Sequence, residues 1–272
     1  MEVPPVKFIK MHGLGNDYIY LNCLERTPED LPALAVRLSD RHFGIGADGL
    51  ICICPSNRAD FKMRMFNADG SEGEMCGNGI RCVGKFVYDQ GLTDRTALNI
   101  ETLAGIKFLA LRPKGGVVEE VTVDMGVPVL DHVRVLPVGD QTITVYPVSM
   151  GNPHAVVFWQ NIAGLDLTVL GPALERHPCF LPARTNVEFV SVQARDRISL
   201  RVWERGSGET LACGTGACAA LAAAASSGRT GRSAAVKLPG GLLQIRWEEN
   251  QHIHMTGPAV TVFKGEFYDG TD

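Results

Sequence analysis

Short apolar runs separated by turn residues make up most of this chain. The runs are rich in Val, Ile and Phe, and Gly, Pro, Asn and Asp stand between them, which is the pattern of short β-strands. Only four stretches have helical patterns, namely residues 28–41, 79–90, 167–177 and 216–227. The last of these carries only small or apolar side chains as far as Ser226, so we expect a buried helix there. The pattern predicts a mixed α/β fold with many strands and few helices.

The two halves of the chain resemble each other at an offset of 137 positions. Residues 63–80 (MRMFNADGSEGEMCGNGI) align without a gap on residues 200–217 (LRVWERGSGETLACGTGA), and their five identities include Cys76 with Cys213. Segments 12–22 and 149–159 share a Gly-Asn pair before an apolar run, and segments 46–53 and 184–192 share a polar turn before a strand. The alternative is that these matches arose by chance in a chain with 30 glycines. The three matching elements occur in the same order in both halves, however, and this favours duplication. We therefore expect two pseudo-symmetric lobes, each a curved mixed β-sheet or barrel wrapped around a central helix, with equivalent groups on opposite walls of one cleft.

Composition and charge narrow the class of protein. The net charge of −4 and the lack of any block of like charges argue against a nucleic-acid partner. The longest charge-free apolar run, residues 217–225, is too short to span a bilayer, and the N-terminal residues lack the apolar core of a signal peptide. Eight cysteines without a secretory signal predict free thiols in a reducing compartment. We expect a soluble intracellular protein without a membrane or nucleic-acid partner.

The two Cys-Gly-[Asn/Thr]-Gly turns, at Cys76 and at Cys213, carry the candidate chemistry. Each turn opens a predicted helix, where free backbone N–H groups bind anions and lower the pKa of an adjacent thiol. Either turn alone could be an ordinary helix start beside a buried cysteine. The occurrence of two such turns at matching places in the repeat makes this alternative weaker. Two opposed thiols suit inversion at a carbon that bears hydrogen, because one thiolate removes the proton while the other thiol delivers one to the opposite face. The helix starts would stabilise the carbanion through its carboxylate oxygens.

Other motifs give little support to a cofactor or metal site. The GIGADG segment, residues 44–49, follows a helical stretch and precedes a strand, which is the reverse of a dinucleotide-binding fingerprint. We expect Cys52 and Cys54 to point to opposite faces of one strand, which disfavours shared metal ligation. No C-x-x-C or H-x-x-x-H pair occurs, so a zinc site has no support. We interpret the remaining cysteines as small core residues: Cys23, Cys82, Cys179 and Cys218.

Polar residues beside the glycine turns are candidates for substrate contact. His154 follows Gly-Asn-Pro, and Glu204 and Arg205 precede a glycine turn. The alternatives are that His154 is a hydrogen-bonded structural histidine and that Glu204 and Arg205 form a solvated charge pair. Five asparagines that flank the repeated motifs would supply donors and acceptors to an ammonium or carboxylate group, although each alone is a common turn residue: Asn16, Asn67, Asn78, Asn152 and Asn186.

At these positions the sequence closely resembles the diaminopimelate epimerase family. The resemblance covers essentially the whole chain and includes KMHGLGNDY, RHFGIGADGL, FNADGSEGEMCGNGIRC, VSMGNPHAVVF, RVWERGSGETLACGTGACAA, LPGG and MTGPA. Proline racemases share the two Cys-Gly loops within different motifs, and phenazine-biosynthesis isomerases share the shape without the cysteine pair. One departure stands out, because Gly49 occupies a position where some members carry a substrate-contacting glutamine.

The resemblance implies a role for each candidate residue. It implies that Cys76 and Cys213 are the acid/base pair, and that His154 near Cys76 and Glu204 near Cys213 tune the thiols. It further implies substrate binding by Asn16, Asn67, Asn152, Asn186, Glu204 and Arg205, and carboxylate binding at the helix starts by Gly77, Asn78, Gly214 and Thr215.

The resemblance also predicts organisation and activity. It implies one lobe from residues 1–118 with 258–272, a second from residues 119–257, and commonly a homodimer. We expect an enzyme that interconverts LL- and meso-diaminopimelate in lysine and peptidoglycan-precursor biosynthesis, without pyridoxal phosphate, another cofactor or a metal. The expected compartment is the cytoplasm, or the plastid stroma if a transit peptide has been removed. The alternatives are a racemase of another amino acid, such as proline, and a non-catalytic protein that binds anions at the helix starts.

Overall fold

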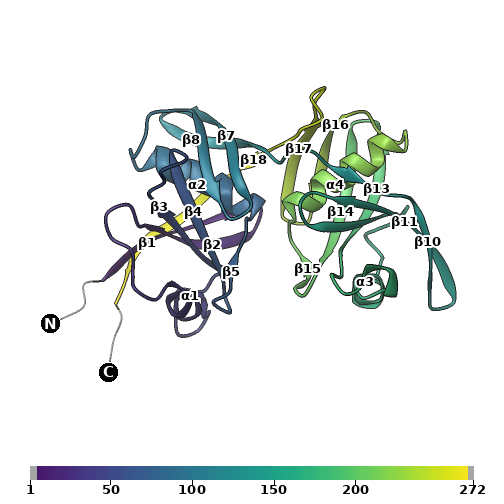
Figure 1. Cartoon of the computed structure of the whole chain (residues 1–272), viewed down its shortest axis with the longest axis horizontal. Helices are drawn as coiled ribbons and strands as arrows, with labels where there is room; N and C mark the ends of the chain where they lie inside the picture. The colour runs from purple at the N-terminus through teal and green to yellow at the C-terminus, as the bar shows by residue number, and fades with distance from the viewer. Residues whose placement is uncertain (1–4, 269–272) are drawn as a thin grey trace. The chain divides into compact units, whose positions relative to one another are not determined.

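Two similar sets of strands and helices form the described chain, residues 5–268 of a computed structural model (Figure 1). Of these residues, 5–123 with 258–268 form one compact unit, and 124–257 form the other. The boundary expected after residue 118 falls inside a strand, Val117–Asp124, that pairs with its neighbour along nearly its whole length. The division therefore comes at the end of that strand.

The first unit is a sheet of mixed strand direction. Its strands run in the spatial order β19, β1, β2, β3, β4, β6, β7, β8, and the β2–β3 and β4–β6 pairs are parallel whereas the others are antiparallel. The short β5 pairs with β4. The elements are β1 (Val6–Gly13), β2 (Asn16–Asn22), α1 (Leu31–Ser39), β3 (Gly49–Cys54), β4 (Phe61–Asn67), β5 (Glu72–Gly73), α2 (Gly77–Asp89), β6 (Ala97–Thr102), β7 (Gly105–Lys114), β8 (Val117–Asp124) and β19 (Val260–Phe267).

The second unit repeats this plan. Its strands run β10, β11, β12, β13, β14, β16, β17, β18, with parallel pairs at the equivalent places, β12–β13 and β14–β16. The elements are β9 (Val129–Leu130), β10 (Arg134–Val138), β11 (Gln141–Ser149), β12 (Pro153–Phe158), α3 (Leu167–Glu175), the 3-10 turn η1 (Pro178–Phe180), β13 (Asn186–Ala194), β14 (Arg197–Glu204), β15 (Gly208–Thr210), α4 (Gly214–Ser226), β16 (Ser233–Leu238), β17 (Gly241–Trp247) and β18 (Ile253–Pro258). The predicted mixed α/β fold with few helices is confirmed.

One helix lies against several strands in each unit. Helix α2 packs on β1, β2 and β7, and α4 packs on β11, β12, β13, β14, β16 and β17. The α4 residues from Ala217 to Ala224 are fully buried, which confirms the expected buried helix. Both helices begin two residues before their predicted starts, at Gly77 and Gly214, because the preceding cysteine caps the helix. None of the helices found between residues 5 and 268 has the length and apolarity needed to cross a bilayer.

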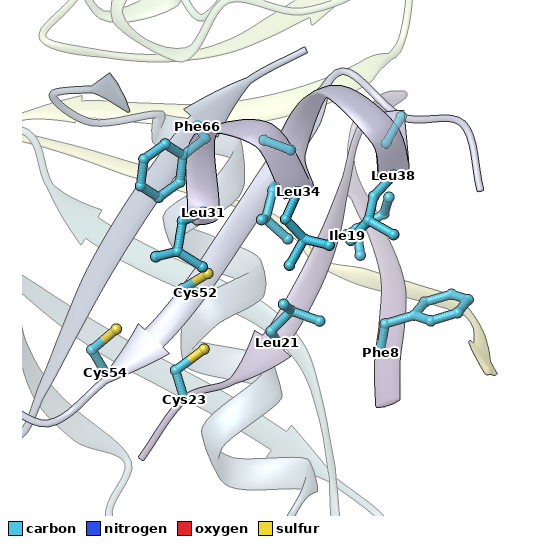
Figure 2. Close-up of a cluster of buried hydrophobic side chains, with 13 residues drawn as sticks. Phe8, Ile19, Leu21, Cys23, Leu31, Leu34, Leu38, Cys52, Cys54 and Phe66 are labelled. Carbon is cyan, nitrogen blue, oxygen red and sulfur yellow. The ribbon is translucent and has the colours of Figure 1, made fainter. Parts of the chain in front are cut away.

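Three thiols gather in the core beneath α1 (Figure 2). Cys23, Cys52 and Cys54 belong to one buried cluster that α1 covers with Leu31, Leu34 and Leu38. The expectation that Cys52 and Cys54 point to opposite faces was wrong, because side chains alternate along a strand and residues two apart share a face. The hydrogen bond with Cys52 and burial raise the pKa of Cys23 to about 12, although the hydrogen bond with Cys54 lowers it.

A second expectation about the cysteines was also wrong. Cys179 is exposed rather than buried, because it lies in the short turn η1 and its sulfur is 3.1 Å from Nδ1 of His177. Cys82 and Cys218 lie in α2 and α4 and are fully buried, as expected.

Candidate active site

A cysteine is the N-cap of each central helix. Cys76 and Cys213 have nearly the same extended backbone, with φ/ψ of −123°/118° and −118°/112°. The Gly79 N–H donates to the Cys76 sulfur at 3.3 Å, and the Gly216 N–H donates to the Cys213 sulfur at 3.4 Å. Each sulfur thus occupies the place that an oxygen of Ser, Thr, Asp or Asn usually takes at a helix start. The positive end of a helix favours a thiolate at this position.

The surroundings of Cys76 come from the start of β2 and the loop before β3. Its thiol donates to Oδ1 of Asn16 at 3.2 Å, and Nδ2 of Asn16 donates to Oδ2 of Asp48 at 2.8 Å. Asp48 in turn accepts from the Arg41 guanidinium at 3.0 Å. Burial raises the pKa of Tyr18, and the nearby Cys76 raises it further, so the phenol stays neutral beside the thiol. Asn16 was predicted to contact substrate, whereas Asp48 and Tyr18 were missed.

A buried arginine supports the start of α2. Arg81 is fully buried and donates to the carbonyl of Gly77 at 3.0 Å and to Oδ1 of Asn78 at 3.1 Å. Its Nε also donates to the carbonyl of Pro258 at 3.2 Å. Arg81 therefore fixes two of the residues that were predicted to hold a carboxylate.

Two more positions in the first unit bear on substrate contact. Asn67 ends β4 and donates to the hydroxyl of Ser71 at 2.9 Å. A Cβ at Gly49 would lie 2.1 Å from the carbonyl oxygen of Phe66, so the backbone here admits no side chain. A glutamine, as some family members carry, does not fit this conformation of the chain.

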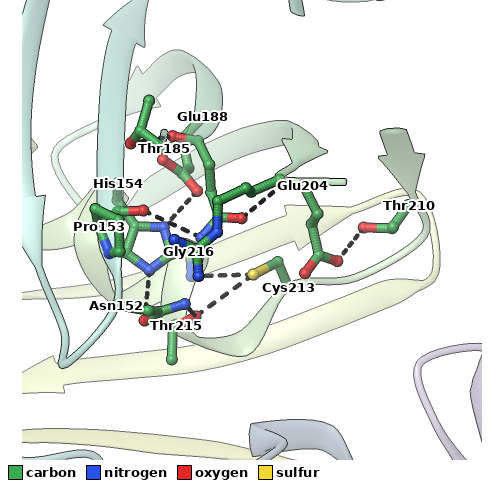
Figure 3. Close-up of polar contacts among 12 residues, drawn as sticks. Asn152, Pro153, His154, Thr185, Glu188, Glu204, Thr210, Cys213, Thr215 and Gly216 are labelled. Atoms are coloured by element: carbon green, nitrogen blue, oxygen red, sulfur yellow. Dashed lines mark hydrogen bonds and ion pairs between the residues drawn. The ribbon is translucent and has the colours of Figure 1, made fainter. Parts of the chain in front are cut away.

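Cys213 lies among several polar groups (Figure 3). Its sulfur is 3.5 Å from Oγ1 of Thr215, and Glu204 lies beside it at the end of β14. Burial raises the pKa of Cys213 well above its ordinary value, and the carboxylates of Glu204 and Glu188 add to this effect. Burial also raises the pKa of Glu204, although hydrogen bonds from Thr210 and Cys213 oppose the rise.

A line of hydrogen bonds runs from a buried carboxylate toward Cys213 (Figure 3). Glu188 and His154 are both fully buried, and Oε1 of Glu188 lies 2.7 Å from Nδ1 of His154. Nε2 of His154 lies 3.0 Å from Oδ1 of Asn152, whose Nδ2 donates to Oγ1 of Thr215 at 3.3 Å. The line ends at the Cys213 sulfur. His154 is thus connected with Cys213 inside its own unit, and its expected proximity to Cys76 stays a prediction.

The remaining predicted residues of the second unit bind one another. Asn186, at the start of β13, donates to the carbonyl of Pro153 at 3.1 Å and accepts from the backbone N–H of Arg205 at 2.9 Å. The Arg205 guanidinium donates to the carbonyl of Ala183 at 2.7 Å. Within residues 5–268, no group of three or more His, Cys, Asp or Glu side chains is arranged to hold a metal ion.

Comparison with known proteins shows the family of this chain. The family model described as diaminopimelate epimerase matches residues 8–130 and 146–262. The chain belongs to the diaminopimelate epimerase family. This membership confirms the resemblance noted in the sequence and makes the chain an enzyme of the isomerase class.

Relatives extend the comparison over nearly the full length. The diaminopimelate epimerase of Acetivibrio thermocellus is 54% identical over 275 residues, which cover 96% of this chain and 98% of that protein. The enzyme of that name from Methanococcus maripaludis strain S2 is also 54% identical, with 96% and 99% covered. Among solved structures, a probable proline racemase from Agrobacterium radiobacter K84 superposes with a TM-score of 0.75 at 18% identity, over 98% of this chain and 93% of that one. The last comparison shows that the fold is shared.

Proposed function

We propose that this chain epimerises diaminopimelate, interconverting the LL and meso isomers with two cysteines as acid and base. The names of relatives at about half identity support the substrate. The observation that carries the mechanism is the pair of equivalent helix starts, each capped by a cysteine sulfur that accepts a backbone N–H.

The proposed reaction moves one proton at each face of the substrate α-carbon. The thiolate of one cysteine takes the α-proton, and the electron pair of the broken C–H bond is delocalised into the α-carboxylate. The thiol of the other cysteine then gives its proton to the opposite face, which inverts the centre and exchanges the protonation states of Cys76 and Cys213. The direction depends on which isomer is bound. This scheme requires both sulfurs to reach the same carbon and needs neither pyridoxal phosphate nor a metal.

The other predicted residues take supporting roles in the proposal. The N–H groups and side chains at Gly77, Asn78, Gly214 and Thr215 would hold the reacting carboxylate, because the first N–H groups of a helix have no partner within the helix. His154 and Glu204 would tune the thiols. Contacts with the ammonium groups and the far carboxylate would come from Asn16, Asn67, Asn152, Asn186, Glu204 and Arg205.

The proposal also extends to the biological setting. We place the reaction in lysine and peptidoglycan-precursor biosynthesis, since that is where diaminopimelate is made and used. Family resemblance supports a homodimer in the cytoplasm. Sedimentation equilibrium of the purified protein tests the dimer, and a monomer at micromolar concentration would contradict it.

Proton exchange in D2O tests the substrate and the mechanism together. The reduced, chelator-treated protein is incubated with LL-diaminopimelate, and NMR follows the α-proton signal. We expect that signal to fall while the meso isomer appears. A folded protein with free thiols that leaves the α-proton in place would contradict the substrate assignment. Exchange with proline instead would indicate an amino-acid racemase of another specificity, and binding without exchange would indicate a non-catalytic protein.

Cysteine variants test the two-base scheme. Replacing Cys76 or Cys213 with Ala should lower epimerisation by at least about 10²–10⁴-fold, the usual contribution of one general acid or base. Serine should be nearly as damaging, because an alcohol is a much weaker acid than a thiol. The matched controls are Cys82→Ala and Cys218→Ala, which remove buried thiols from the same two helices. The scheme fails if either capping cysteine proves as dispensable as its control.

A further inference from the structure

Glu188 is a buried acid that the proposed reaction does not use. Its side chain is fully buried in β13, and Oε1 contacts Nδ1 of His154. Its other oxygen, Oε2, is buried and has no hydrogen-bond partner among residues 5–268. Burying a carboxylate destabilises a fold unless it is fully partnered, so packing alone gives no reason for an acid here.

The internal repeat offers a direct comparison. At the offset of 137 positions, Ile51 is the equivalent of Glu188, and both side chains lie against a helix-start glycine. A Cβ at Gly79 would lie 2.6 Å from Cδ1 of Ile51, and a Cβ at Gly216 would lie 2.8 Å from Oε1 of Glu188. An aliphatic side chain therefore fills this position in one half of the chain. The carboxylate in the other half serves something other than packing.

The contacts of His154 indicate what the carboxylate does. Both ring nitrogens lie against oxygen atoms, Nδ1 against Glu188 and Nε2 against the amide oxygen of Asn152. An amide oxygen only accepts hydrogen bonds, so Nε2 carries a hydrogen. An ionised carboxylate only accepts hydrogen bonds, so Nδ1 donates its hydrogen to Oε1 of Glu188.

The direction of the remaining hydrogen bonds follows from this placement. Because Oδ1 of Asn152 accepts from His154, its Nδ2 faces Oγ1 of Thr215 and donates to it. The Thr215 oxygen is then an acceptor on that side, and its own hydrogen is free to point at the Cys213 sulfur. The Gly216 N–H points at the same sulfur. Two donors therefore converge on Cys213, and their hydrogen bonds oppose the larger rise in its pKa that burial causes.

We propose that Glu188 is a positioning residue for the proposed epimerisation. Its carboxylate holds a hydrogen on Nδ1 of His154 and so fixes the direction of the hydrogen bonds that pass through Asn152 and Thr215 to Cys213. This inference rests on the proposed function for its role in catalysis, but the placement of the hydrogens does not depend on that function.

The first test is the state of the His154 ring, read from its ¹⁵N signals by NMR and assigned with a His154→Gln spectrum. The wild-type ring should carry a hydrogen on both nitrogens, because both face oxygen atoms that accept hydrogen bonds. Glu188→Ile, which copies the other half of the repeat, and Glu188→Gln should each leave only one hydrogen on the ring, because the negative partner is gone. A wild-type ring with a bare Nδ1 would overturn the proposal, and so would either variant that keeps both hydrogens. Ile51→Val, a matched core change in the other unit, should leave the His154 signals unaltered.

The second test is kinetic. Glu188→Ile should lower kcat/KM for LL-diaminopimelate about tenfold or more, and Glu188→Gln should fall less because its amide still holds the ring in place. A Glu188→Ile enzyme as active as wild type would overturn the positioning role. If Glu188→Ile does not fold, the ring hydrogens and kinetics of Glu188→Gln decide. A wild-type protein without epimerase activity would overturn the proposed function, whereas the NMR result would still decide the hydrogen placement.

Discussion

A single methyl group added at Gly216 tests whether this position is closely packed against Glu188. The alternative is that the methyl group only changes the helix propensity of α4. In Gly216→Ala the new Cβ would lie 2.8 Å from Oε1 of Glu188 and 3.3 Å from the Cys213 sulfur. The carboxylate cannot move away freely, because it is buried and bound to His154 at 2.7 Å. Overpacking of this kind costs about 1–3 kcal/mol. Alanine in place of glycine in a helix gains no more than about 1 kcal/mol. We expect Gly216→Ala to lower the free energy of unfolding by about 1–2 kcal/mol.

The assay uses tryptophan fluorescence during urea unfolding. All three tryptophans of the chain lie between residues 159 and 247, so the signal reports on the second unit. A double-mutant cycle with Glu188→Ala isolates the contact. Once the carboxylate is gone, the added methyl group should cost little or stabilise the unit, which corresponds to a coupling of about 2 kcal/mol. The same loss in both backgrounds would refute the reasoning, because the carboxylate would then not be what the methyl group meets.

Two further predictions concern the groups around each thiol. Asp48→Ala removes the acceptor that orients Asn16, so kcat/KM should fall about tenfold, the effect of one hydrogen bond to a charged group. Urea unfolding should change by less than about 1 kcal/mol, since the Asp48–Arg41 pair is largely exposed, and unchanged kinetics would contradict the orienting role. Glu204→Gln should raise the stability of the second unit at pH values above the raised pKa of Glu204, and it should lower activity. The raised pKa of Glu204 means that wild type binds this proton more tightly when folded and loses stability as the pH rises through that pKa. Equal slopes of stability against pH for wild type and Glu204→Gln would rule this out. Thr210→Val removes a hydrogen bond that lowers the pKa of Glu204, so the stability of this variant should fall more steeply with pH than that of wild type.

Much of the fold could be predicted because its signals are local or repeated. Glycine turns and apolar runs located the helices within a few residues, and the all-apolar segment after Gly216 identified a buried helix. The exact helix starts were missed because a cysteine is not a usual cap, and only the structure shows its sulfur accepting a backbone N–H. Cys179 was misplaced because a cysteine in a short surface turn looks like a core cysteine from composition alone.

The site was predicted less completely, because its supporting residues are defined by contacts distant in sequence. In the segment TNVEFV, the sequence alone gives no sign that Glu188 differs from any other strand residue. Its role becomes visible only through its contact with His154, which is 34 positions away in the sequence. The offset of 137 positions did carry a usable signal, since it places an acid where the first half has Ile51. Asp48 is similar, because its contact with Asn16 joins the loop before β3 to the start of β2.

The pairing of the first strand with the last has a consequence for synthesis of the protein. Strand β1 is hydrogen-bonded to β19 from Val6 to His12, yet β19 ends only at Phe267. Until those last residues have left the ribosome, one edge of β1 lacks its partner, and an unpaired strand edge invites association with other chains. The second unit, by contrast, is continuous from residue 124 to 257 and is complete earlier in translation. Removal of β19 would therefore damage the unit made first, and a link between Val6 and Phe267 would join two residues that already pair.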